Sequence, residues 1–229
     1  MTREREENEN FRFLEVNGER RLVTINLSPN IQVYGERLLI RNGVEYRVWD
    51  PFRSKLAASI LSGVKNIPFK KGSYVLYLGV STGTTVSHIS DIVGNEGIIY
   101  GVELAQRVAR EFIDRVTKHR KNVIPILENA RSPENYIPQV EEVDIVYSDI
   151  AQSDQTEIAI ANCVRYLKRN GSLFLVVKSR SIDVTASPKS VFREQIKKLN
   201  NNGFKIIEMV ELRPFDRDHA IIYATYMNG

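Results

Sequence analysis

The stretch Tyr74-Val75-Leu76-Tyr77-Leu78-Gly79-Val80-Ser81-Thr82-Gly83-Thr84-Thr85 decides the fold. It begins as a short apolar run, passes through two glycines, and continues into Val86, Ile89 and Val93 at helical spacing. This order predicts a strand, a tight turn and a helix. Because glycine has no Cβ and the first N–H groups of a helix are unpaired, such a turn can hold a nucleotide-like ligand.

Glu103 is a second feature that points to a nucleoside. It directly follows the strand-like run at 97–102, about 20 residues beyond the glycine turn. An acidic side chain at this place binds ribose hydroxyls in dinucleotide-type folds. The turn lacks the full G-x-G-x-x-G pattern, because Ser81 stands where the second glycine would be. Each feature alone also occurs without a ligand, and their combination predicts one.

The composition is that of a globular protein from a reducing compartment. The chain has 229 residues, of which 42% are hydrophobic and 26% charged, so it can build a substantial core. Its apolar runs are too short to span a bilayer, and its charged N-terminus does not resemble a secretory signal, so we expect a cytoplasmic protein without membrane contact. The single cysteine, Cys163, excludes an intramolecular disulfide and is expected to be buried. No zinc-ligand spacing is present, so no metal site is predicted.

Basic residues are concentrated in two segments of the chain. Residues 51–80 carry five Lys and Arg and no acidic residue, and residues 163–205 carry ten against two. Residues 81–162 have the opposite balance, seven basic against thirteen acidic. If the two basic segments meet in space, they form a cationic face that favours a nucleic acid partner over other polyanions.

The first 50 residues predict a small antiparallel β domain. Residues 1–10 are polar and charged, which predicts disorder. Two pairs of strand-like segments follow, and they flank Asn17-Gly18 and Asn42-Gly43, both of which are hairpin signals. A module of this size has little core of its own, so we expect it to pack on the rest of the chain.

Residues 51–229 predict a Rossmann-like α/β domain. The expected strands lie at 74–79, 97–103, 122–127, 143–149 and 171–178, and the expected helices at 84–93, 105–118, 153–168 and 188–200. This alternation predicts a parallel sheet covered on both faces. Segments 205–212 and 219–226 have no room for a helix between them and must form an antiparallel hairpin, so the last strand runs against the others.

The chain resembles the archaeal members of the fibrillarin family, RNA 2′-O-methyltransferases of box C/D guide complexes. The motifs occur in order over most of the chain, and their combination is specific. They are Trp49-Asp50-Pro51-Phe52-Arg53-Ser54-Lys55-Leu56-Ala57-Ala58, Leu78-Gly79-Val80-Ser81-Thr82-Gly83-Thr84-Thr85, Asp149-Ile150-Ala151-Gln152, Lys178-Ser179-Arg180-Ser181-Ile182-Asp183-Val184-Thr185 and Pro214-Phe215-Asp216-Arg217-Asp218-His219.

The resemblance implies S-adenosylmethionine as the methyl donor. The donor contacts that it implies lie at the ends of four strands, at Gly79, Gly83, Thr84, Thr85, Glu103, Leu104, Asn129, Ala130, Asp149, Ile150, Ala151 and Gln152. Asn129 departs from the family pattern, which commonly has Asp at this position near the adenine amino group. The amide can still accept a hydrogen bond through its oxygen or donate one through its NH₂ group.

Four residues match the catalytic constellation of ribose 2′-O-methyltransferases, namely Lys55, Asp149, Lys178 and His219. In the expected topology all four lie at the carboxyl edge of the sheet. Lys178 is the expected base for the 2′-hydroxyl, because burial beside a second cation, Lys55, favours a neutral amine. Asp149 is expected to orient Lys178 and the donor, and His219 to position the ribose or its base.

Two other functions remain open from the residues alone. Gly79-Val80-Ser81-Thr82-Gly83 matches the G-x-S-x-G motif of serine esterases, and Ser81, Asp149 and His219 follow the chain order of the α/β-hydrolase triad. The chain could also be a non-catalytic RNA- or protein-binding module of the same fold. Covalent labelling of Ser81 would favour the esterase, and donor binding without methyl transfer would favour the module.

The resemblance also implies a set of partners. They are a box C/D guide RNA, a target RNA, a Nop-domain scaffold protein and a kink-turn-binding protein. The implied targets are pre-rRNA and tRNA. The sequence has no base-reading motif of its own, so we expect the guide RNA to select the target while the cationic face binds the RNA backbone.

Overall fold

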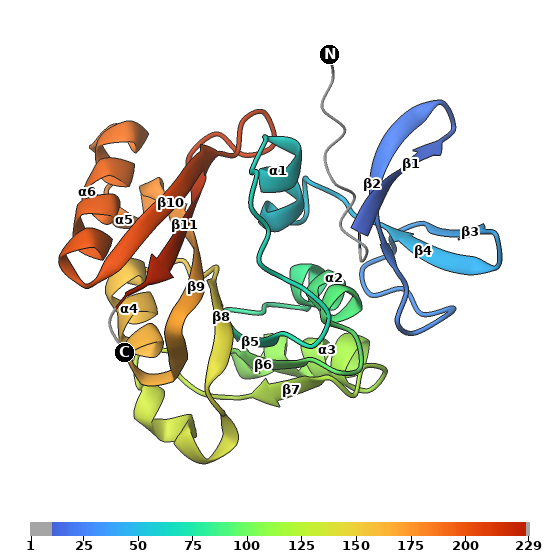
Figure 1. Ribbon diagram of the computed structural model, residues 1–229, viewed down its shortest axis with the longest axis horizontal. Helices are drawn as coiled ribbons and strands as arrows, with labels where there is room; N and C mark the ends of the chain where they lie inside the picture. Colours follow the sequence, from blue (N-terminus) through green and yellow to red (C-terminus); the bar gives the residue numbers. More distant parts are fainter. Residues whose placement is uncertain (1–10, 228–229) are drawn as a thin grey trace.

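Two sheets form the framework of this computed structural model, which describes residues 11–227 (Figure 1). The smaller sheet is antiparallel, with the strand order β1-β2-β4-β3. Its strands are β1 (Phe11–Val16), β2 (Glu19–Ile25), β3 (Leu38–Arg41) and β4 (Val44–Val48). The disorder predicted for residues 1–10 lies outside the described residues.

Both predicted hairpins are confirmed. Asn17, Gly18, Asn42 and Gly43 all have positive φ angles, between 52° and 79°. Two successive residues with positive φ define the type I′ turn, whose twist matches that of the strands it joins. The Asn-Gly dipeptides therefore set the register of β1 on β2 and of β3 on β4.

The larger sheet has seven strands in the order β10-β11-β9-β8-β5-β6-β7. Strands β5, β6, β7, β8 and β9 pair in parallel, and β11 is antiparallel to both of its neighbours. The predicted terminal hairpin and reversed last strand are thus confirmed. The strands are β5 (Tyr74–Leu78), β6 (Ile98–Val102), β7 (Val123–Ile126), β8 (Val143–Ser148), β9 (Leu167–Lys178), β10 (Phe204–Glu211) and β11 (His219–Tyr226).

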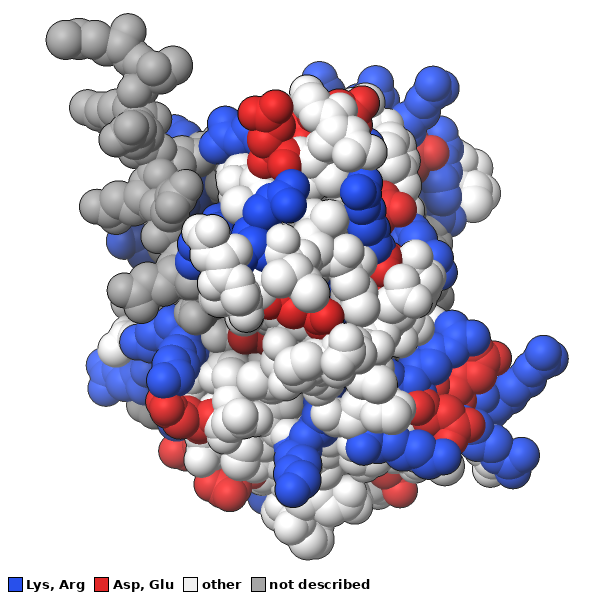
Figure 2. Space-filling view, turned by 90° about the vertical axis from the view of Figure 1, so that its right-hand side faces the viewer, with Lys and Arg blue, Asp and Glu red and all other residues white. Residues whose placement is uncertain are grey.

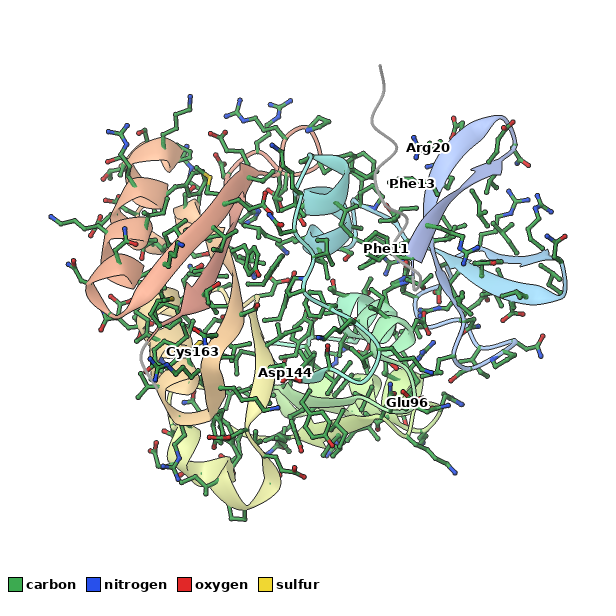
Figure 3. The ribbon with its side chains drawn as sticks, in the orientation of Figure 1. Phe11, Phe13, Arg20, Glu96, Asp144 and Cys163 are labelled. Carbon is green, nitrogen blue, oxygen red and sulfur yellow. The ribbon has the colours of Figure 1, made fainter. Side chains whose placement is uncertain are left out.

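Helices cover both faces of this sheet. On one face lie α1 (Lys55–Leu61), α2 (Thr84–Val93) and α3 (Gln106–Phe112), and on the other α4 (Gln155–Tyr166) and α6 (Pro188–Asn201). Successive side chains of β5 alternate between the two cores, since Val75 and Tyr77 face the first group and Leu76 and Leu78 the second. Cys163 lies on α4 in the second core and is fully buried, as expected (Figure 3).

The small sheet is joined to the large domain by buried charges as well as by apolar contacts. Arg47 on β4 forms ion pairs with Glu36 and with Asp91 on α2, and Arg120 also pairs with Asp91. All four side chains are almost completely shielded from solvent. We expected the module to pack on the rest of the chain, and this network anchors it on α2. The boundary expected between residues 50 and 51 falls in the loop before α1 and stays a prediction.

The surface of the small sheet is of mixed charge. In Figure 2, which faces this side of the molecule, Lys and Arg side chains are spread over the face and its margins, Asp and Glu lie among them and near the centre, and uncharged residues fill the space between. None of the helices in residues 11–227 combines the length and the apolar character needed to cross a bilayer.

Three elements were not predicted. The expected helix at 105–118 ends in a π-helical turn, Ile113–Thr117, and a 3-10 segment, Pro133–Gln139, follows β7. A short helix, α5 (Ser179–Ile182), follows β9. Strand β9 also begins at Leu167, inside the expected helix at 153–168, where Leu167 pairs with Val143 of β8 ahead of a shift in register.

Candidate active site

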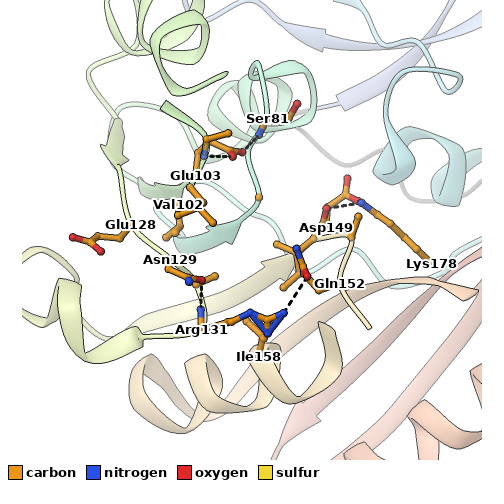
Figure 4. A pocket seen from close by; sticks show the side chains of 16 residues that line it. Ser81, Val102, Glu103, Glu128, Asn129, Arg131, Asp149, Gln152, Ile158 and Lys178 are labelled. Carbon is orange, nitrogen blue, oxygen red and sulfur yellow. Dashed lines mark hydrogen bonds and ion pairs between the residues drawn. The ribbon is translucent and has the colours of Figure 1, made fainter. Parts of the chain in front are cut away.

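A pocket of about 370 Å³ opens at the carboxyl ends of the central parallel strands (Figure 4). Nine of the predicted donor-binding residues line it, and they come from the loops after β5, β6, β7 and β8. The predicted residues are Gly79, Glu103, Leu104, Asn129, Ala130, Asp149, Ile150, Ala151 and Gln152. The position agrees with the rule that α/β sheets bind ligands at this edge.

The glycine turn has the backbone conformation that only small residues adopt readily. Gly79 has a φ of 80°, Ser81 of 53° and Gly83 of 102°. A Cβ on Gly79 would lie 2.9 Å from Cγ2 of Ile150, which itself lines the pocket. A Cβ on Gly83 would lie only 2.3 Å from Cγ2 of Val116 in the π-helical turn. The absence of a side chain at Gly79 thus leaves room for Ile150 at the pocket wall. The absence of one at Gly83 allows the start of α2 to pack closely against Val116.

Replacement of Gly83 by alanine is expected to destabilise the protein. The new methyl group would overlap Val116, and overpacking of this kind costs about 1–3 kcal/mol. Gly72→Ala is the matched control, because Gly72 also has a positive φ, 79°, but has nothing within 4 Å of the added Cβ. The difference in Tm between the two variants measures the overlap alone. Equal Tm values would show that the turn accommodates the added methyl group without a loss of folding stability.

Glu103 is held between two loops at the upper side of the pocket. Its two carboxylate oxygens accept hydrogen bonds from the backbone N–H groups of Ser81 and Ala105, both at 3.0 Å. The carboxylate is thereby fixed in orientation, close to the turn after β5 (Figure 4). This arrangement fits the predicted contact with ribose hydroxyls, for which a carboxylate is an acceptor.

Thr84 and Thr85 do not line the pocket, and neither does Gly83. Thr85 is buried, and its hydroxyl donates to the side-chain oxygen of Ser54 at 2.9 Å. Ser54 caps the N-terminus of α1. Thr85 therefore links the glycine turn to the helix that begins with Lys55. The donor contacts expected at Gly83, Thr84 and Thr85 stay predictions.

The far side of the pocket contains residues that sequence reasoning missed. Arg131 follows Asn129 and Ala130, and its backbone N–H donates to the Asn129 amide oxygen at 3.0 Å. Its guanidinium donates to Gln152 at 3.0 Å and pairs with Asp154. Arg131 thus bridges the loops after β7 and β8 across the pocket (Figure 4). The only signal in the sequence was its place next to two expected contact residues.

The four predicted catalytic residues are brought together. Nζ of Lys178 lies 2.8 Å from Oδ1 of Asp149 and donates to its backbone oxygen at 2.7 Å. Nζ of Lys55 lies 3.5 Å from the same Oδ1 atom. His219 is opposite Lys178 in the pairing of β11 with β9, and its ring pairs with Asp216. Asp149 and Lys178 line the pocket, whereas Lys55 and His219 are not among its lining residues.

Three of the four predicted catalytic residues have a local structural reason for their position. Lys55 is the first residue of α1 and follows the Ser54 cap. Lys178 ends β9, and its backbone N–H donates to the side chain of Gln155 at 3.0 Å. The backbone N–H and the hydroxyl of Ser179 both donate to the Asp218 carbonyl, which ties the end of β9 to the residue before His219.

Two buried tyrosines lie on the strands that lead into this cluster. The rings of Tyr77 on β5 and Tyr147 on β8 lie 4.6 Å apart. Burial, together with the negative charge of Asp149, raises the pKa of Tyr77 well above its usual value. Burial, Tyr77 and Asp149 do the same to the pKa of Tyr147. Both phenols therefore stay protonated and uncharged beside Asp149.

The sheet order, the single reversed strand and the pocket at the carboxyl edge together define a Rossmann-like methyltransferase fold. Residues 2–228 match the sequence model of the family described as Fibrillarin. The chain belongs to the fibrillarin family, which confirms the resemblance inferred from the sequence motifs.

Individual relatives agree with this assignment. The chain is 52% identical to a fibrillarin-like rRNA/tRNA 2′-O-methyltransferase of Saccharolobus solfataricus, over 91% of this chain and 90% of the relative. It is similar to the crystal structure of Aeropyrum pernix fibrillarin with natively bound S-adenosyl-L-methionine, with a TM-score of 0.89, 46% identity and coverage of 96% and 95%. It is also similar to fibrillarin in a fibrillarin/Nop5p complex, with a TM-score of 0.85, 42% identity and coverage of 96% and 98%.

Proposed function

We propose that this chain is an S-adenosylmethionine-dependent RNA 2′-O-methyltransferase that acts within a box C/D guide RNA complex on rRNA and tRNA. The observation that carries the proposal is the meeting of Lys55 and Lys178 at the Asp149 carboxylate, beside a pocket large enough for a nucleoside. The names of the relatives support the same reaction, the same donor and the same RNA classes.

The residues around the pocket fit the proposed donor. Glu103 offers a fixed carboxylate for the ribose hydroxyls, and Asn129 offers an amide at the opposite side for the adenine. Ala130 and Ile150 provide apolar surface between them. Asp149, which contacts both lysines, would hold the methyl-bearing end of the donor. When bound there, S-adenosylmethionine supplies a methyl group that is already activated by its sulfonium charge.

The reaction needs a group that removes the proton of the 2′-hydroxyl. Lys178 lines the pocket and has the lower exposure, 14% against 26% for Lys55. We therefore assign the base to Nζ of Lys178, with Asp149 orienting it and Lys55 keeping the carboxylate paired during the proton transfer.

His219 is assigned a positioning role. Its ring pairs with Asp216 rather than with Asp149, and it stands next to Lys178 across the β9–β11 pair. It is therefore placed to contact the substrate ribose or its base, beside the amine that takes the proton. Alignment of the hydroxyl with the methyl group supplies much of the rate in such reactions.

The alternative functions have less support. In the described part of the chain the Ser81 hydroxyl makes no hydrogen bond to His219 or Asp149, and the Ser81 backbone N–H is bound to Glu103 instead. A serine esterase needs a hydrogen bond from the nucleophilic serine hydroxyl to the histidine, here from Ser81 to His219. A non-catalytic module has no need for two lysines that meet at one carboxylate beside the pocket, as Lys55 and Lys178 do at Asp149.

The proposed partners follow from the relatives. One solved relative is a fibrillarin/Nop5p complex, which supports docking of a Nop-domain scaffold on this chain. A box C/D guide RNA, its target RNA and a kink-turn-binding protein complete the proposed assembly. We also propose that the assembly is located in the cytoplasm.

Reconstitution with scaffold, kink-turn-binding protein, guide RNA and methyl-labelled donor tests the proposed function. We expect label on one target nucleotide, and we expect its loss when that nucleotide carries a 2′-deoxyribose. A 2′-deoxy nucleotide one position away is the matched control and is expected to leave the label in place. Donor binding by calorimetry without any methyl transfer would instead establish a non-catalytic module.

A further inference from the structure

A second groove, of about 450 Å³, separates the small sheet from α1. Its walls come from β2, from the end of β4, from α1 and from the loops before β3, α1 and β11. Figure 3 shows Arg20 with Phe11 and Phe13 on the side of the small sheet that faces α1. None of these walls contributes to the donor pocket.

The groove is strongly basic. Four arginines line it, at positions 20, 21, 37 and 53, and all four are exposed. Of the two acidic residues in its wall, Glu36 is buried and neutralised by Arg47, and the Asp50 carboxylate accepts a hydrogen bond from the Phe52 backbone. Arg21 is paired with Glu19, which leaves three arginines against Asp50, so the charge presented to a ligand is positive and favours a polyanion.

Aromatic rings stand among these arginines. The Phe52 side chain is 74% exposed, although it is held edge-on against Phe215 with the ring centres 5.3 Å apart. The Arg53 guanidinium lies 4.9 Å over the Tyr34 ring and donates to the Tyr34 carbonyl at 2.8 Å. An exposed, oriented ring within a basic groove is the arrangement that binds single RNA strands, with phosphates on the cations and a base on the ring.

Two chain segments connect the wall of the groove with the catalytic cluster. Phe52 lies three residues before Lys55, whose Nζ atom is 3.5 Å from Asp149. Phe215 lies one residue before Asp216, which pairs with His219. The contact between Phe52 and Phe215 thus joins the two loops that lead to Lys55 and to His219.

We propose that this groove binds the RNA strand that adjoins the methylated nucleotide, with its phosphates on Arg37 and Arg53 and one of its bases against Phe52. The inference rests on the proposed function, because it concerns the RNA that enters that active site. It names a binding subsite outside the donor pocket and the catalytic cluster.

The test compares variants inside and outside the groove in the fully assembled complex. Phe52→Ala and Arg37→Gln alter the groove, and Ile40→Ala and Arg41→Gln are matched controls on β3, which contributes nothing to its walls. Ile40 is 67% exposed, comparable with Phe52. The measurements are KM for target RNA and kcat, donor affinity by calorimetry, and crosslinking of 4-thiouridine placed at successive positions beside the target nucleotide.

We expect Phe52→Ala to raise KM for target RNA roughly tenfold, as loss of one stacked base would, with kcat and donor affinity unchanged. Arg37→Gln is expected to reduce the slope of log affinity against log salt by about one. Crosslinks from one or two positions should disappear in Phe52→Ala and persist in both β3 variants.

Two results would overturn the proposal. Unchanged KM and unchanged crosslinks in Phe52→Ala and Arg37→Gln would exclude RNA from the groove. Loss of scaffold binding in size-exclusion chromatography, with KM for RNA unaffected in the complexes that still form, would make the groove a protein-docking surface instead. Failure of the unaltered protein to methylate any target would refute the proposed function, and crosslinking would still report on the groove.

Discussion

Replacement of Lys178 by alanine is expected to reduce the rate of guided methyl transfer by about 10²- to 10⁴-fold, the usual contribution of a general base. The amine lines the pocket and lies 2.8 Å from the Asp149 carboxylate, so its removal takes away the group placed to accept the 2′-hydroxyl proton. Single-turnover assays with saturating donor and RNA isolate this step. Calorimetry on the same variant checks that the donor still binds.

Two further variants distinguish the base from other roles of the same side chain. Lys178→Arg keeps the positive charge beside Asp149, but a guanidinium does not lose its proton, so it is expected to be nearly as inactive. Lys168→Ala removes a lysine that pairs with Asp144 at the same distance, 2.8 Å, on the exposed surface, and it should be fully active. High activity of Lys178→Arg would limit the residue to electrostatic positioning.

The order of strands and helices could be predicted from the sequence, because local signals decide it. Asn17-Gly18 and Asn42-Gly43 determine their hairpins without help from the rest of the chain. The segment from Tyr74 to Thr85 has its strand, turn and helix coded within a dozen residues. The convergence of Asp149 and Lys178 follows from parallel pairing, since both lie at the ends of neighbouring strands.

Features that depend on contacts between distant segments could not be predicted. The role of Arg131 requires Gln152 and Asp154, which lie on another loop. The hydroxyl of Thr85 donates to Ser54, the N-cap of α1. The turn sequence considered alone predicts instead that this hydroxyl contacts the ligand. The buried pairing of Arg47 with Asp91 joins residues 44 positions apart, and no periodicity in the sequence marks either of them.

Replacement of Asp91 by asparagine tests that buried network and is expected to cost about 3–5 kcal/mol of folding stability, the usual penalty for breaking a buried ion pair from one side. The Asp91 side chain is fully buried. Its carboxylate accepts hydrogen bonds from Arg47 at 2.8 Å and from the Thr24 hydroxyl at 2.7 Å, and it also forms an ion pair with Arg120. A neutral amide leaves two guanidinium groups without their shared countercharge. It also brings NH₂ donors against groups that donate already.

For a chain of this length, such a loss corresponds to a fall in Tm of about 6–20 °C. Asp114→Asn is the matched control, because Asp114 pairs with Lys118 on the surface, where both side chains are 61% exposed, and its Tm should match that of the unaltered protein. The adjoining His88 adds no charge of its own, since burial and the two arginines hold its pKa well below the usual value. Equal Tm values for the two asparagine variants would mean that apolar packing alone attaches the small sheet to α2.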